Sequence, residues 1–413
     1  MGAGAAGNAN AACQQKLLRR LFRAVLCVIL PCVASAAAED GATPVAEKRA
    51  PFPERVERAA TRVADELERM GLYPYVTSLA TGGGAAPGVA YFDPTAGGGR
   101  LGLYGGLSQS VKGDSLLEVR LGRIPHEPGR APSRRPGFEW MPGFVAGERG
   151  ERFYAFGQAK LLELGAGRYL QGYSDPLRQE SFDAVAGYRL SPKLALQAQA
   201  GILSVSPGRG AHSLGMEFAP ALDAPGLAWR RDYARFSSEV AWDGRARPRN
   251  PRGGQFASLR LDRYQGLGAT PDFSRASLDV RHFQSLGSER HVLALRALAS
   301  VADTDGVAVP FYLQDSLGGG SILRSYAEHR FSGDRLLAFS AEYRFQAAPW
   351  LQLAAFHDGG RAWGGFSSLD SGGFRSSTGV GLRLTTPTRV LLRFDVARGD
   401  DGARLNVKAG YSF

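Results

Sequence analysis

The residues of this 413-residue chain that could perform acid–base or nucleophilic chemistry do not form a recognisable catalytic pattern. The six histidines are scattered, and none lies four residues from another potential metal ligand. No Gly-x-Ser-x-Gly sequence marks a nucleophilic serine, and no spacing of Ser, His and Asp indicates a hydrolase. Asp303, Asp305 and Asp315 could bind a cation, but acidic loop residues more often keep a loop soluble. We therefore expect no enzyme activity, no metal and no cofactor.

A second distinctive group is a glycine-rich stretch that leads to an arginine. Residues 317–326 read Leu-Gly-Gly-Gly-Ser-Ile-Leu-Arg-Ser-Tyr, which predicts a loop carrying Arg324. If that loop folds back into a protein interior, the arginine needs a counter-charge, because removing a charge from water is costly. The chemistry to expect is ion pairing, and the elements around the loop must position the partner.

The segments around this loop alternate apolar and polar side chains. In residues 336–345 the apolar side chains Leu337, Phe339 and Tyr343 share one face, whereas Glu342 and Arg344 share the other. A side-chain period of two is that of a β-strand. Both faces persist for nine or ten residues in successive hairpins, and no helical pattern is present to cover them. This is typical of a transmembrane β-barrel, apolar toward lipid and polar toward the lumen.

The same alternation recurs along most of the chain and predicts an all-β fold. Fourteen strands are expected, at 98–108, 114–123, 151–162, 181–190, 193–203, 234–243, 254–264, 274–285, 290–301, 335–345, 350–361, 375–384, 389–397 and 403–413. Two more, in 134–145 and 166–174, would complete a single barrel of about sixteen antiparallel strands. Short connections alternate with long ones such as 204–232 and 302–334, so we expect the short turns on the periplasmic side.

The region before the barrel is expected to direct export and then to form a short periplasmic segment. Residues 1–38 resemble a signal peptide, with a basic part at 16–23, an apolar run at 24–33 and small residues at 34–36. Residues 39–87 are predicted to be a linker with an amphipathic helix at 54–70. That helix either docks at or plugs the barrel, or is a simple tether. The barrel domain is expected at 88–413.

Charge and cysteine content narrow the possible partners. All three cysteines lie before residue 38, so a mature chain without thiols would suit export through the periplasm. The net charge of +11 could suit anionic lipid headgroups or an anionic solute, but a solvated lumen and loops are the preferred explanation. No basic helix or mixed aromatic and basic motif indicates a nucleic acid partner.

Three motifs occur in a fixed order over about 170 residues. Residues 242–254 contain Asp-x-Arg followed by Pro-x-x-Gly, residues 317–326 are the stretch described above, and residues 356–360 read Phe-His-Asp-Gly-Gly. Together they resemble the BamA/TamA superfamily of outer-membrane barrels, also called the bacterial surface antigen family. The middle motif is similar to the tip of that family's sixth extracellular loop, through Gly318, Gly319, Gly320, Leu323, Arg324, Ser325 and Tyr326. Tyr411 and Phe413 resemble the family's aromatic C-terminal assembly signal.

The resemblance implies that Arg324 pairs with Asp358 and thereby holds the loop inside the barrel. Alternation along the strand turns Asp358 inward, and Glu342 also faces inward and could share Arg324. The alternative is that Arg324 lies on a solvated loop tip. The family has a glycine where this chain has Ser325. If that position needs a positive φ, serine costs about 1 kcal/mol or shifts the loop.

The resemblance also implies a location and a function. Family members that insert or secrete proteins carry POTRA domains before the barrel, but we expect none in the short segment here. The expected location is the Gram-negative cell outer membrane, reached through the periplasm. Expected partners are outer-membrane lipid and lipopolysaccharide, the barrel-assembly machinery and a separate periplasmic protein. The expected function is protein or lipid translocation or assembly. A passive solute channel and a structural surface antigen are the alternatives.

Overall fold

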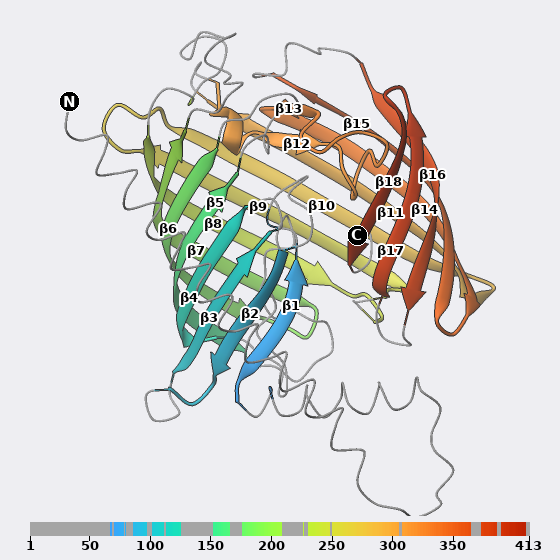
Figure 1. Cartoon of the computed structure of the whole chain (residues 1–413), viewed down its shortest axis with the longest axis horizontal. Helices are drawn as coiled ribbons and strands as arrows, with labels where there is room; N and C mark the ends of the chain where they lie inside the picture. The colour runs from blue at the N-terminus through green and yellow to red at the C-terminus, as the bar shows by residue number, and fades with distance from the viewer. Residues whose placement is uncertain are drawn as a thin grey trace, which may run out of the picture. The chain divides into compact units, whose positions relative to one another are not determined.

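The computed structural model contains one antiparallel sheet of sixteen strands, in which neighbours in space are neighbours along the chain (Figure 1). A two-stranded ribbon, β12–β13, is separate from it. The chain divides into two compact units, residues 1–73 and 74–413, and nearly all of the sheet belongs to the second. The structure describes residues 67, 70–77, 79, 86–96, 101–110, 113–124, 152–165, 176–208, 226, 230–247, 250–304, 308–364, 373–385 and 390–409.

The first eleven strands follow one another without interruption. They are β1 (Leu72–Thr77), β2 (Ala86–Asp93), β3 (Gly102–Gln109), β4 (Ser115–Arg123), β5 (Phe153–Leu164), β6 (Leu177–Arg189), β7 (Leu194–Pro207), β8 (Arg231–Asp243), β9 (Gly254–Gly266), β10 (Phe273–Leu286) and β11 (Ser288–Asp303). Five more complete the sheet after a long connection. They are β14 (Arg335–Ala348), β15 (Leu351–Trp363), β16 (Arg375–Thr385), β17 (Val390–Gly399) and β18 (Gly402–Ala409).

All fourteen strands predicted from the alternation are present, as β3–β11 and β14–β18, with ends shifted by a few residues. The two segments expected for the last strands, 134–145 and 166–174, lie outside the described residues. Because β4 pairs directly with β5, and β5 with β6, no strand of this sheet lies between them. The sheet instead reaches sixteen strands with β1 and β2, which begin before the predicted barrel boundary at residue 88. β1 has only six residues, so its alternation is too brief to recognise in the sequence.

Several predicted segments lie outside the described residues. These are the signal peptide at 1–38, residues 54–66 of the amphipathic helix, the segments 134–145 and 166–174, and the C-terminal Tyr411 and Phe413. Their roles stay predictions. In the part of the chain that is described, no helix is long and apolar enough to span a membrane.

The two faces of the sheet differ as the alternation predicts. On β14, Leu337, Phe339 and Tyr343 are exposed, whereas Glu342 and Arg344 are buried. The same division holds along most of the other strands, where large apolar side chains point outward and charged side chains point inward. Exposed apolar side chains are favourable against hydrocarbon, and inward charges can pair with one another across strands.

The connection between β11 and β14 packs against the inward face. We call residues 308–334 the inner loop. It contains the 3-10 helix η2 (Phe311–Leu313) and the ribbon of β12 (Asp315–Leu317) and β13 (Phe331–Gly333) (Figure 1). Phe311 and Tyr312 join one apolar cluster with residues of β5–β11, and Leu317, Leu323, Tyr326 and Phe331 join a second with β11, β14 and β15. The loop is therefore anchored at two separate places on the wall.

Candidate functional site

Arg324 is the central residue of the site, and none of its side chain is exposed. Its Nε and Nη2 donate to Asp358 Oδ2 and Oδ1, at 2.9 and 3.0 Å. Its Nη1 donates to Glu342 Oε2 at 2.9 Å and to Asp395 Oδ2 at 3.3 Å. The guanidinium carbon lies 3.4 Å from the centroid of the Phe356 ring, which covers one side of the cation. The two parallel bonds to Asp358 form a bidentate pair, which fixes orientation as well as charge.

The local backbone explains how the loop presents this arginine. Gly318 and Gly319 have φ values of 115° and 86°, and a Cβ at Gly318 would clash with the carbonyl oxygen of Ala327. The amide of Gly319 then donates to the carbonyl of Tyr326 at 3.0 Å, which closes the turn. Leu323 has a φ of 55°, and its burial in the second apolar cluster offsets that strained conformation.

Ser325 does not have the positive φ considered from the sequence, so serine is not strained at this position. Its amide donates to Ser377 Oγ at 2.9 Å. Its side chain faces Gly399, where a Cβ would clash with Ser325 Oγ. The chain therefore accommodates the serine through a close approach to a glycine on β17.

The pair belongs to a larger buried network on the walls of β14–β17. Its members are the carboxylates Glu342, Asp358 and Asp395 and the guanidiniums Arg324, Arg344, Arg383 and Arg393. Four cations and three anions leave one positive charge in excess. Glu342 also accepts from Arg344 at 2.6 Å and from Arg383 at 2.7 Å. In such a cluster the loss of one member leaves a partner charge buried without compensation.

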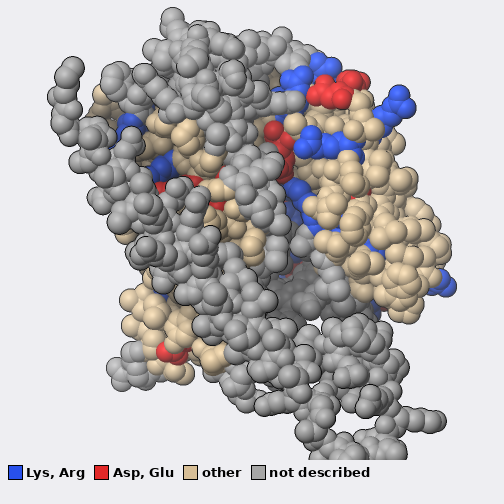
Figure 2. Space-filling view, viewed as in Figure 1, with Lys and Arg blue, Asp and Glu red and all other residues tan. Residues whose placement is uncertain are grey.

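The inner loop is also joined to the β17–β18 hairpin. Tyr326 Oη donates to Asp400 Oδ2 at 3.0 Å, and Asn406 Nδ2 donates to the carbonyl of Arg324 at 2.7 Å. Closer to solvent, Arg330 pairs with Asp401 at 2.8 Å. Figure 2 shows basic and acidic side chains side by side at the upper right, over the loop ends of the last strands. These contacts make the hairpin part of the loop's binding surface.

The imidazole of His329, in the inner loop and outside the strands, has an altered pKa. Burial lowers the pKa of His329 below its ordinary value, and the nearby Glu328 opposes that shift only in part. His329 Nδ1 is 2.7 Å from Ser316 Oγ, which joins the two sides of the β12–β13 ribbon. The loop is therefore built to hold a neutral imidazole at this position.

The structure brings together Arg324, Asp358 and Glu342, as the sequence comparison implied. It adds Asp395 and Phe356, which sequence reasoning missed. Phe356 precedes Asp358 by two residues on the same strand, so its inward direction could have been predicted from the alternation. Asp395 contacts Arg324 from a strand two places away, and only the register of β15, β16 and β17 reveals that.

The other predicted motif residues lie elsewhere. Asp243 is buried and accepts from Nε and Nη2 of Arg245, at 2.9 and 2.8 Å, so the first motif forms its own ion pair in the β8–β9 connection. Asp303 lies on the outward face of β11, whereas Asp315 is buried in the inner loop beside Arg275. Asp303 and Asp315 therefore do not lie together as ligands of one cation, and Asp305 lies outside the described residues. No three potential ligands converge on a metal position among the described residues.

An antiparallel sheet with an apolar outer face, a charged inner face and a loop held against that inner face defines an outer-membrane β-barrel protein. Comparison with known families agrees, because residues 217–413 match the Omp85 superfamily domain. Residues 217–413, a little under half of the chain, therefore carry the Omp85 superfamily domain, which supports a BamA/TamA-like barrel located in the outer membrane of Gram-negative bacteria.

One solved structure supports the same fold. The chain is similar to BamA from Haemophilus ducreyi lacking POTRA domains 1-3, with a TM-score of 0.57 and 13% identity over 86% of this chain and 77% of that chain. It is also similar to CdiB from Escherichia coli, with a TM-score of 0.49 and 11% identity over 86% of this chain and 71% of that chain. At these identities the likeness concerns the fold alone. No curated protein matches the sequence.

Proposed function

We propose that this barrel translocates or assembles protein or lipid at the outer membrane, and that the inner loop closes its lumen at rest. The observation that carries the proposal is the complete burial of Arg324 among three carboxylates of the inner wall. A loop that only shielded the barrel mouth would not need a desolvated cation at its tip. The match to the Omp85 superfamily domain supports the translocation and assembly class.

The two anchors of the inner loop give the proposal a physical mechanism. The aromatic anchor at Phe311 and Tyr312 is held by apolar contact, which has no direction and allows small movements. The anchor at Arg324 is directional, because its bidentate pair is satisfied in only one geometry. Release of Arg324 would free the loop tip while the aromatic anchor keeps the loop attached. A substrate that competes for Asp358 or displaces the loop tip could then pass.

A passive solute channel is the second candidate, because the buried network carries one positive charge in excess and could favour anions. Depletion of the chain in its native host separates the two functions. The translocation and assembly proposal expects a changed set of outer-membrane proteins or lipids after depletion. The wild-type chain should restore it, and Arg324→Ala should restore it less well than Arg330→Ala, which breaks only a partly exposed pair. An unchanged outer membrane with reduced anion uptake would instead favour the channel.

A further inference from the structure

We propose that the outward face of the sheet carries a binding site for a phosphorylated glycolipid of the outer leaflet, of the lipopolysaccharide type. An acyl chain would lie in a hollow over β8–β11, and a phosphate would contact Arg335 and Arg361 on the neighbouring strands. This inference does not depend on the proposed function, because it concerns the opposite face of the wall from the inner loop.

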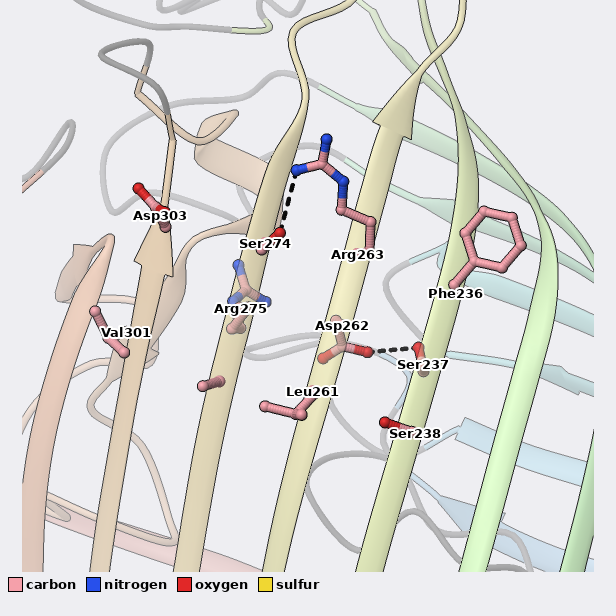
Figure 3. A pocket seen from close by; sticks show the side chains of 11 residues that line it. Phe236, Ser237, Ser238, Leu261, Asp262, Arg263, Ser274, Arg275, Val301 and Asp303 are labelled. Atoms are coloured by element: carbon pink, nitrogen blue, oxygen red, sulfur yellow. Dashed lines mark hydrogen bonds between the residues drawn. The ribbon is translucent and has the colours of Figure 1, made fainter.

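The hollow has a volume of about 510 Å³ and spans four strands near the end where the long loops lie (Figure 3). The strand register arranges its outward side chains in two parallel rows. The row nearer the loops contains Phe236, Arg263, Ser274 and Asp303, and the next contains Ser238, Leu261, Ala276 and Val301. Three of the four side chains in the deeper row are apolar, and three of the four in the row nearer the loops are polar or charged.

The shape of the hollow follows from the residues of its central strand. Strand β10 presents only the small side chains Ser274 and Ala276, whereas the flanking strands present Leu261 and Val301. Side chains stand roughly perpendicular to a sheet, so two small residues between larger ones leave a furrow along the strand. Figure 3 shows Leu261 and Val301 on either side of β10, with Arg263 nearer the loops. At its deeper end the furrow is lined by Leu261, Ala276 and Val301, which suits a segment of hydrocarbon chain there.

The cations beside this furrow suit a phosphate. Arg335 lies directly opposite Val301 on β14, and Arg361 lies on β15, opposite Leu337. Both are exposed, and neither forms an ion pair with another described residue. The Arg361 guanidinium lies 5.7 Å from the centroid of the Trp363 ring, as expected where an aromatic belt meets the membrane interface.

The charged side chains that line the furrow itself are less suited to binding an anion. Arg263 already donates to Ser274 Oγ at 3.2 Å and to Asp272 Oδ2 at 2.5 Å. Asp303 is exposed directly across from Ser274 and would repel a phosphate. The phosphate is therefore placed on the Arg335 side, and the carboxylate of Asp303 becomes a useful test of that placement.

The position of Arg335 along its strand indicates which membrane leaflet would supply the lipid. Asp303 and Arg335 are the residues of β11 and β14 next to the long connection that contains the inner loop. Long connections lie on the extracellular side in outer-membrane barrels. A phosphate at this level therefore belongs to a lipid of the outer leaflet.

The test measures lipid binding to the refolded full chain by native mass spectrometry, with a bisphosphorylated glycolipid, its dephosphorylated form and phosphatidylglycerol as probes. Each arginine near a membrane surface contributes about fivefold to binding an anionic lipid. We expect Arg335→Gln with Arg361→Gln to weaken binding of the phosphorylated glycolipid about 25-fold. Arg398→Gln is the matched control, because Arg398 is equally exposed on the outward face but lies on β17, away from the furrow. It should change little, and Asp303→Asn should strengthen binding.

A second variant tests the furrow independently of charge. Ala276→Phe should fill it and weaken binding of the phosphorylated and dephosphorylated glycolipids alike. Equal binding of those two lipids to the unaltered chain would overturn the phosphate contact. Equal binding of phosphatidylglycerol would overturn the assignment to a glycolipid. Equal losses from Arg398→Gln and from the double variant would show diffuse charge attraction rather than a site.

Discussion

The most demanding prediction concerns Arg324→Ala, which removes the cation at the tip of the inner loop. Asp358 would lose both strong donors and keep mainly the hydroxyl of Ser340, which donates to it at 2.5 Å. Glu342 would still have Arg344 and Arg383, so Asp358 bears most of the loss. Removal of one partner from a buried ion pair costs about 3–5 kcal/mol. Since every 1.4 kcal/mol is tenfold, the local opening equilibrium of the loop should rise by about 100- to 4,000-fold.

Hydrogen exchange of the backbone amides in the inner loop, followed by mass spectrometry, measures that opening directly. Exchange in the inner loop should accelerate strongly in Arg324→Ala, while the amides of β9 and β10 keep their protection. Arg330→Ala is the matched control, because its pair with Asp401 is partly exposed and worth about 1 kcal/mol or less. Adding Asp358→Ala to Arg324→Ala should recover part of the lost protection, since it removes the orphaned carboxylate. The reasoning fails if Arg324→Ala and Arg330→Ala give equal exchange rates.

Three further predictions concern the loop and the first motif. Gly318→Ala should lower the temperature at which the folded band is lost on a gel more than Gly402→Ala does. Both glycines have positive φ, but only at Gly318 would a Cβ clash with the backbone; equal losses would contradict this. Asp243→Ala should destabilise the barrel toward urea by about 3–5 kcal/mol, because it removes the carboxylate that pairs with the buried Arg245, and an unchanged midpoint would refute the importance of that ion pair. Because burial lowers the pKa of His329 in the folded loop, its contribution to loop stability is present above pH 6.5 and is lost as the pH falls toward the folded pKa. After correction for the intrinsic exchange rate, which itself falls with pH, the opening equilibrium of the loop should therefore rise between pH 8 and pH 5, and His329→Gln should abolish that rise.

Much of this fold can be predicted from the sequence because a strand's side chains alternate with a period of two. That period assigns Glu342 and Asp358 to the inward face without any knowledge of their partners. The alternation does not show which residues of neighbouring strands lie opposite one another, because turns and packing determine that register. Asp395 was missed for this reason, since it reaches Arg324 only through the registers of two successive strand pairs.

Short strands and unusual backbone conformations were the other features that the sequence did not predict. Six residues at Leu72–Thr77 are too few for a pattern, so β1 was assigned to a linker. The left-handed conformation of Leu323 was also not predictable from the sequence. The family has glycine at the position of Ser325, so strain was expected at Ser325 and not at Leu323. In the structure the positive φ occurs at Leu323, and the burial of that side chain in the second apolar cluster offsets the strain.

The most direct test of the central claim, that the inner loop closes the lumen, is planar-bilayer conductance of the refolded chain with and without residues 308–334. The intact chain should be nearly closed, and the deletion should open a large, steady pore. Arg324→Ala should show brief openings between these two states. Steady conductance by the intact chain, unchanged by the deletion, would contradict the claim and favour a passive channel.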